Sequence, residues 1–152
     1  MRRQFASDLY KLMKEDKNII LITADLGYGM LDKIRDDIPG QFYNVGAAEQ
    51  AMVGIATGMA LSGKIAVCYT ITPFYFRAFE MIRNYVDHEN IPVKLVASGR
   101  DKDYSHDGFS HDASDHNIYK VFKNIDFIVP ENSFNLAEII YSGKPTYLNL
   151  KR

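Results

Sequence analysis

Hydrophobic and polar residues alternate along the chain in blocks that predict a repeating order of helix and strand. Within residues 2–15, apolar side chains recur at helical spacing at Phe5, Leu9 and Met13, which is typical of an amphipathic helix. Residues 19–24 form a continuous apolar run rich in isoleucine, and this pattern favours a strand covered on both faces. The chain therefore opens with a helix that is followed by a buried strand.

The same alternation continues to the end of the chain. Further strands are predicted at 42–45, 65–70, 92–98, 127–129 and 146–150. Further helices are predicted near 31–37, 47–62, 74–88, 115–122 and 133–142. No linker, internal repeat or low-complexity tract interrupts this order, so we expect a single domain over residues 1–152. The predicted fold class is α/β, with a mostly parallel open sheet of about six strands and helices on both faces.

Ligands of such sheets bind outside the carboxyl ends of the strands. Three segments are therefore expected to meet at one edge: the turn after Ala24, the turn after Val45 and the polar segment 99–114. This last segment follows neither the helical nor the strand period, and it contains two glycines, four aspartates and two histidines. A long polar stretch inside a compact domain is typical of a functional loop.

The composition narrows the classes of function. Of the 152 residues, 47% are hydrophobic and 24% are charged, as in globular proteins. The 18 Lys and Arg residues nearly balance the 19 Asp and Glu residues, which argues against a general nucleic-acid-binding surface. No apolar run approaches the roughly 18 residues of a membrane span, and the single Cys68 fits a reducing compartment. We expect a cytoplasmic protein with neither a nucleic-acid nor a membrane partner.

Three short motifs follow one another in the positions where the predicted strands end. They are Thr-Ala-Asp-Leu-Gly at 23–27, Asn-Val-Gly-Ala-Ala-Glu-Gln at 44–50 and Asp-Gly-Phe-Ser-His at 107–111. Together they resemble the pyrimidine-binding domain of the transketolase family of thiamine-diphosphate enzymes. 1-Deoxy-D-xylulose-5-phosphate synthases and the beta subunits of 2-oxo acid dehydrogenase decarboxylating components are similar. The resemblance extends over nearly the whole chain, from residue 3 to residue 152.

The resemblance implies a catalytic, cofactor-binding role for Glu49. In this family the 4′-amino group of thiamine diphosphate becomes a base only when a proton is shared at ring atom N1′. A carboxylate in a low-dielectric pocket has a raised proton affinity and can share that proton. The alternative is an ordinary acid that interacts with the dipole of the helix it begins. Asp25 matches an acid near the cofactor, and its alternative is an Asp that closes a turn through backbone N–H groups.

Residues 70–77 resemble the segment whose aromatic ring stacks on the aminopyrimidine of the cofactor. The alignment favours Phe74 for this contact and places Phe76 second. Offset aromatic stacking contributes roughly 0.5–1.5 kcal/mol beyond the buried area. Plain core packing is the alternative for both rings. Arg77 matches a substrate-facing arginine of the deoxyxylulose-phosphate branch, with a solvated helix-face charge as its alternative.

The resemblance also implies residues that contact the substrate. His111 corresponds to a histidine that faces the substrate carbonyl, where an imidazole can donate to a developing alkoxide and move its proton. Asp107 matches an acid that binds a substrate hydroxyl. Arg100 matches the deoxyxylulose branch, and Arg152 resembles a terminal-strand arginine that meets phosphate in transketolases. Arginine suits bidentate recognition of phosphate.

A zinc site is a competing explanation of the histidines, because His106, His111 and His116 are spaced by five. On a helix this spacing scatters the three rings over different faces, and Gly108 disfavours a helix there. We therefore predict that this chain holds no metal ion itself.

Members of this family bind the cofactor diphosphate through Mg²⁺, which a Gly-Asp-Gly motif and a later Asn hold in a second domain. The sequence contains no Gly-Asp-Gly. We therefore expect a split enzyme, in which a separate diphosphate-binding subunit holds Mg²⁺ and two copies of each chain form a heterotetramer. The small-residue helix at 47–62 could form part of that contact, although packing within the fold explains it equally well.

The expected reaction is transfer of a two-carbon ketol unit between sugar or sugar-phosphate substrates. A 1-deoxyxylulose-phosphate-synthase-like subunit or a 2-oxo acid decarboxylating component is one alternative. A non-catalytic binding or regulatory module of the same fold is another. The pair Asp107 and His111 favours ketose chemistry, and the presence of Glu49 together with His111 argues against a module without turnover.

Overall fold

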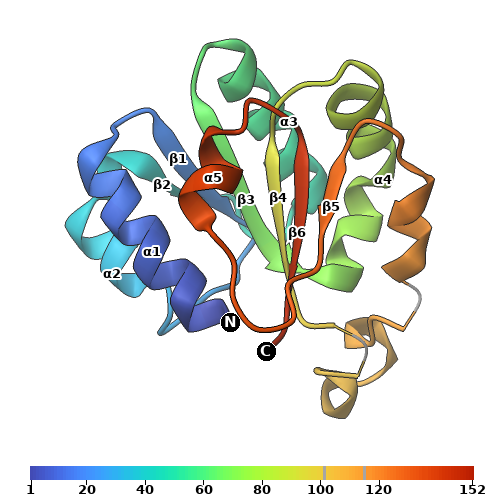
Figure 1. The fold of residues 1–152 in the computed structure, drawn as a ribbon. Helices are drawn as coiled ribbons and strands as arrows, with labels where there is room; N and C mark the ends of the chain where they lie inside the picture. Colours follow the sequence, from blue (N-terminus) through green and yellow to red (C-terminus); the bar gives the residue numbers. More distant parts are fainter. Residues whose placement is uncertain (101, 115) are drawn as a thin grey trace.

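The computed structural model describes residues 1–100, 102–114 and 116–152. Within these ranges, six strands form one open sheet in the order β2-β1-β3-β4-β6-β5, and every pairing is parallel (Figure 1). The strands are β1 (Ile19–Thr23), β2 (Phe42–Asn44), β3 (Ile65–Ile71), β4 (Lys94–Ser98), β5 (Asp126–Ile128) and β6 (Thr146–Leu150). The predicted parallel α/β sheet is confirmed.

Helices cover both faces of the sheet (Figure 1). The α-helices are α1 (Arg2–Glu15), α2 (Asp32–Asp37), α3 (Glu49–Leu61), α4 (Phe79–Met81) and α5 (Leu136–Tyr141). Short 3-10 turns are η1 (Pro39–Gln41), η2 (Thr72–Ala78), η4 (Ser105–Asp107), η5 (Phe109–His111) and η6 (His116–Val121), and η3 (Ile82–His88) is a π-helical turn. In the described part of the chain, no helix combines the length and apolar character needed to cross a membrane.

The core lies in two layers, one on each side of the sheet. Successive side chains of a strand point to opposite faces, so Leu21 of β1 belongs to the same core layer as Phe5 of α1, and Ile22 belongs to the other layer with Met52 of α3. All five residues of β1 are buried. The continuous apolar run at 19–24 predicts a strand covered on both faces, and the burial of β1 confirms this prediction.

The prediction of one long helix at 74–88 is wrong about the type of helix. The segment instead passes from the 3-10 turn η2 through the short α4 to the π-helical turn η3. Pro73 supplies no backbone N–H, and the Tyr75 hydroxyl inside η2 donates to the carbonyls of Cys68 and Val96. These buried bonds tie η2 to β3 and β4, so tertiary contacts override the local helical period.

The helix predicted at 115–122 is a 3-10 turn over His116–Val121, and Asp115 lies outside the described residues. The helix predicted at 2–15 and the strand predicted at 146–150 have the predicted bounds, and the other boundaries lie within three residues of their predictions, as expected where helices fray and strands end in turns. The helix predicted at 133–142, for example, begins at Leu136 because the Asn135 side chain accepts the N–H of Glu138.

Candidate active site

Two of the three segments expected at the carboxyl edge are tied together directly. Oδ1 of Asn44, at the end of β2, accepts the backbone N–H of Asp25 and the backbone N–H of Gly46, each at 3.0 Å. Asp25 has a left-handed φ of 54°, a conformation that side chains other than Gly, Asn and Asp seldom adopt. The turn after β1 is thus held in an uncommon shape beside the start of α3.

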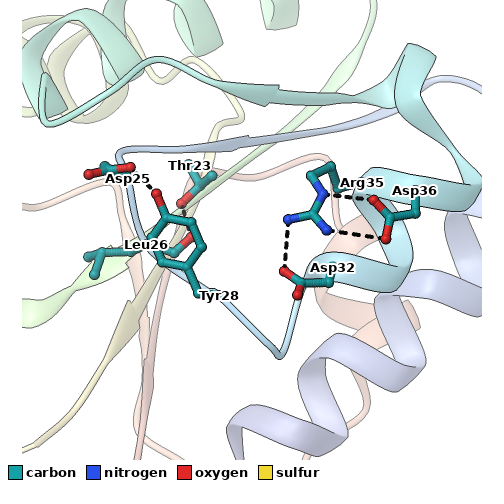
Figure 2. A network of polar contacts seen from close by, with 7 residues as sticks. All are labelled: Thr23, Asp25, Leu26, Tyr28, Asp32, Arg35 and Asp36. Carbon is teal, nitrogen blue, oxygen red and sulfur yellow. Dashed lines mark hydrogen bonds and ion pairs between the residues drawn. The ribbon is translucent and has the colours of Figure 1, made fainter.

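The Asp25 side chain is exposed and bonded within its own turn. The Tyr28 hydroxyl donates to Asp25 Oδ1, and Figure 2 shows the phenol ring reaching back over the turn to that carboxylate. This hydrogen bond raises the pKa of the Tyr28 hydroxyl. Inside the same turn, the Thr23 hydroxyl donates to the carbonyl of Leu26 at 2.8 Å. The geometry is that of a closed turn with an accessible carboxylate.

Glu49 is the first residue of α3, and its side chain is only 1% exposed. Oε1 accepts a hydrogen bond from Arg77 Nη1 at 2.7 Å. Oε2 is buried and has no hydrogen-bond partner among the described residues. A buried polar atom without a partner is costly and calls for an explanation. Among the described residues, Thr70, Tyr147 and Asn149 also have buried side-chain polar atoms without a partner, but Glu49 is the acid among them.

Phe74 and Arg77 lie on one side of η2, because residues three apart eclipse in a 3-10 turn. The guanidinium carbon Cζ of Arg77 lies 4.0 Å from the centroid of the Phe74 ring. The Phe74 and His111 rings meet edge to face, with centroids 5.1 Å apart. These contacts form a chain in which Glu49 touches Arg77, Arg77 touches Phe74, and Phe74 touches His111. We call these four residues the Glu49 cluster.

His111 belongs to η5 in the polar segment 99–114, the third segment expected at this edge. Its Nδ1 is 3.0 Å from the hydroxyl of Ser110, which helps to orient the ring. Phe76 points elsewhere: its ring stacks on Tyr119 with centroids 5.3 Å apart, against the buried core. The structure therefore brings Phe74, but not Phe76, into the Glu49 cluster.

A second group of polar residues surrounds the ring of Tyr104. Arg2 Nη1 donates to the Tyr104 hydroxyl at 2.7 Å, and the Cζ of Arg152 lies 5.0 Å from the ring centroid. His106 Nε2 is 3.2 Å from Arg152 Nη1 and 3.3 Å from Asp107 Oδ2. We call Arg2, Tyr104, His106, Asp107 and Arg152 the Tyr104 cluster. It joins two predicted substrate residues, Asp107 and Arg152.

The position of Tyr104 depends on Gly99, which follows β4. Gly99 has a φ of +83°, and a Cβ at this position would overlap the Tyr104 ring. The Tyr104 hydroxyl also lies 3.0 Å from Ser98 Oγ. A glycine is therefore required where β4 ends and the polar segment begins.

Arg100 is buried, and the charged partner of its side chain lies outside both clusters. Its side chain is 9% exposed, and Nη1 lies 3.5 Å from Glu131 Oε1. Its backbone N–H donates to Asp103 Oδ2, which also accepts the backbone N–H of Arg152. Asp103 thus joins the segment after β4 to the segment after β6.

Several residues of this edge are not indicated by any periodicity or motif. They are Arg2, Tyr28, Asp103 and Tyr104. The glycines at 99 and 108 give the only local signal, since turns of left-handed φ frame the segment that holds Tyr104. Within the described ranges, no three His, Cys, Asp or Glu side chains come together as a group able to hold a metal ion.

The fold and site together define a parallel α/β domain with a cluster of polar and aromatic side chains at its carboxyl edge and a buried acid at the start of a helix. Residues 1–147 match the family model described as "Transketolase, pyrimidine binding domain". The chain belongs to this family, and the predicted resemblance is confirmed.

Curated relatives agree with that assignment. A putative transketolase C-terminal section from Methanocaldococcus jannaschii is 32% identical over 160 positions, which cover 100% of this chain and 50% of the relative. A 1-deoxy-D-xylulose-5-phosphate synthase from Halothermothrix orenii is 32% identical over 141 positions, which cover 91% of this chain and 22% of the relative. The chain therefore spans half or less of the length of these relatives.

Solved structures show the same fold. A structure described as "Split gene transketolase, inactive beta4 tetramer" superposes with a TM-score of 0.77 at 28% identity, over 97% of this chain and 50% of that one. A transketolase from Campylobacter jejuni superposes with a TM-score of 0.87 at 17% identity, over 99% of this chain and 25% of that one.

Proposed function

We propose that this chain, as a single domain, is the pyrimidine-binding subunit of a thiamine-diphosphate-dependent, transketolase-like transferase. The reaction is transfer of a two-carbon ketol unit between sugar or sugar-phosphate substrates. The observation that carries the proposal is the buried carboxylate of Glu49, whose Oε2 has no partner among the described residues and whose ion-pair partner Arg77 lies over the face of the Phe74 ring. Family membership supports the proposal.

The residues of the Glu49 cluster fit an aminopyrimidine ring. When bound, thiamine diphosphate supplies a thiazolium carbon that adds to the carbonyl of a ketose. Oε2 of Glu49, which is buried, can share a proton with a ring nitrogen, and this proton sharing is general acid–base work. The Phe74 ring offers a stacking surface, and His111, in edge contact with Phe74, can hold or donate a proton toward a substrate oxygen.

We assign substrate contacts to five residues at the carboxyl edge. They are Arg77, Arg100, Asp107, His111 and Arg152. The arginines favour an anionic group such as phosphate, and Asp107 can accept a hydrogen bond from a sugar hydroxyl. Asp25, exposed beside the start of α3, is assigned to the proton or positioning network of the cofactor, whereas Phe76 faces the core.

A partner subunit is the second part of the proposal. The sequence has no Gly-Asp-Gly motif for Mg²⁺, and the Methanocaldococcus jannaschii relative is described as a section of a transketolase. The structural neighbour is described as a split-gene transketolase in an inactive beta4 tetramer, which supports division of the enzyme between separate chains. We propose a heterotetramer in which a diphosphate-binding subunit holds Mg²⁺. The free, buried Cys68 suits a cytoplasmic location, since burial raises the pKa of its thiol and keeps it unreactive.

A deoxyxylulose-phosphate-synthase-like reaction is the second candidate. The 32% identity to the Halothermothrix orenii synthase favours it, as does Arg77 at the place where that branch has an arginine. The two candidates differ in the donor substrate, because the synthase reaction begins with decarboxylation of a 2-oxo acid.

The test is reconstitution with the diphosphate-domain subunit of the same organism, thiamine diphosphate and Mg²⁺. We expect ketol transfer by the pair and none by either chain alone. Release of CO₂ from a 2-oxo acid would instead select the second candidate. Full turnover by this chain without the partner, or no cofactor-dependent reaction of the pair with either donor, would contradict the proposal.

A further inference from the structure

Arg77 makes two contacts that are rarely combined in one side chain. Its Nη1 lies 2.7 Å from Glu49 Oε1, and its Cζ lies 4.0 Å from the centroid of the Phe74 ring. A guanidinium group is flat, positively charged and edged with N–H donors. It can therefore stack on an aromatic ring and donate a hydrogen bond to a carboxylate at the same time.

A protonated aminopyrimidine has the same three properties: a flat ring, a positive charge and an N–H donor at its edge. A ring that stacks on Phe74 and shares a proton with Glu49 must lie between these two residues, where the guanidinium of Arg77 lies. We propose that Arg77 is an internal stand-in for the aminopyrimidine, which keeps Glu49 and Phe74 in position and which the cofactor displaces on binding. This inference rests on the function proposed above.

Exposure identifies which of the paired residues moves. The Glu49 side chain is 1% exposed and begins α3, so it cannot reach water without unwinding the helix. The Arg77 side chain is 50% exposed, and its head group can rotate into solvent while its backbone stays in η2. A buried carboxylate without a counter-charge is strongly unfavourable, so Arg77 stabilises Glu49 until another donor replaces it.

The test compares Arg77→Ala with wild type in the assembled pair, by calorimetric titration of thiamine diphosphate in the presence of Mg²⁺. Loss of the competing group is expected to tighten binding by about 2- to 5-fold, the equivalent of one exposed cation–π contact. Without cofactor, the Arg77→Ala chain is expected to unfold at a lower temperature than wild type. Saturation with thiamine diphosphate is expected to raise its unfolding temperature by more than it raises that of wild type. Arg77→Lys keeps the charge but not the flat group, so its affinity is expected to lie between the two.

Arg83→Ala is the matched control, because Arg83 is an exposed arginine of η3 bonded only to its neighbour Asn84 among the described residues. Its cofactor affinity is expected to equal that of wild type. Unchanged or weaker binding by Arg77→Ala overturns the inference, provided that Glu49→Gln weakens binding in the same assay. If wild type does not bind thiamine diphosphate, or if Glu49→Gln binds as well as wild type, the proposed function fails and the inference fails with it.

Discussion

Two buried charged side chains, at opposite edges of the sheet, are held in contrasting ways. Glu49 at the carboxyl edge has one oxygen paired with Arg77 and one without a partner among the described residues. Lys94, the first residue of β4, is 2% exposed at the amino edge, and its Nζ donates to Ser142 Oγ at 2.8 Å and to the carbonyl of Lys144. The ammonium group of Lys94 is thus hydrogen-bonded within the fold, whereas only one of the two carboxylate oxygens of Glu49 has a partner among the described residues.

The difference separates a structural charge from a functional one. Lys94 ties β4 to the turn between α5 and β6, and burial lowers the pKa of its ammonium group to about 8, although Asp126 opposes the shift. Glu49 ties α3 to η2 through one oxygen and leaves the other available. The two hydrogen bonds of Lys94 both go to the segment before β6 and hold the fold together, whereas the buried Oε2 of Glu49 has no partner among the described residues, which agrees with the ligand-binding role proposed for it.

The largest expected effect comes from Glu49→Gln. The amide keeps the shape of the side chain and can still accept from Arg77, but it cannot share a proton with a ring nitrogen. We expect the turnover number of the assembled pair to fall by about 10²- to 10⁴-fold, with little change in the thermal midpoint. Glu80→Gln, which alters an exposed acid of α4, is the control and should leave both unchanged. Normal turnover by Glu49→Gln would remove this residue from the mechanism.

The next effect concerns stability and its pH dependence. Between about pH 8 and the ordinary lysine pKa of 10.5, the unfolded chain keeps the Lys94 proton and the folded chain loses it. The contribution of Lys94 to the free energy of unfolding therefore rises with pH across this window. Between pH 8 and pH 9.5, the free energy of unfolding of wild type should therefore rise by about 2 kcal/mol relative to that of Lys94→Met.

Urea unfolding of both proteins at the two pH values measures this gain. Lys11→Met is the control, because it removes a lysine whose side chain is 68% exposed. The difference in free energy of unfolding between wild type and Lys11→Met should not change by this amount with pH. A constant gap between wild type and Lys94→Met would show that burial does not depress this pKa.

The two phenylalanines of η2 give a smaller contrast. Phe74→Leu removes the proposed stacking surface, so the affinity for thiamine diphosphate should fall by about 2- to 13-fold. Phe76→Leu removes a ring that stacks on Tyr119, so it should lower the thermal midpoint and leave the affinity close to wild type. Calorimetric titration and thermal unfolding of both variants measure the pattern. The opposite pattern would exchange the roles of the two rings.

The smallest effect is expected at an exposed carboxylate. Tyr28→Phe removes the hydrogen bond to Asp25, but water replaces it, so the free energy of unfolding should change by less than about 0.5 kcal/mol. Asn44→Ala removes the acceptor of two backbone N–H groups in the same turns and should cost about 1 kcal/mol. Denaturant unfolding measures both, and a larger loss in Tyr28→Phe would make the Asp25 contact a structural one.

Much of this protein is predictable from local patterns. The continuous apolar run of β1 indicates burial on both faces, and the strand–helix order indicates parallel pairing, because each strand needs a crossover to reach the next. The three ordered motifs also indicate that residues 23–27, 44–50 and 107–111 share an edge. Hydrophobic periodicity does not reveal that residues 74–88 wind as 3-10 and π turns, since the bonds of Tyr75 to other strands decide it.

The amino-acid sequence by itself determined the α/β class, the family and the residue types gathered at the carboxyl edge. Only the tertiary structure decided that Phe74 faces Arg77 and His111 while Phe76 faces Tyr119. It also decided that one oxygen of Glu49 has no partner in the part of the chain that the structure describes. Periodicity reflects interactions between residues a few positions apart. The partners of a buried carboxylate are set by contacts between segments far apart in sequence, which form only when the sheet and its turns are assembled.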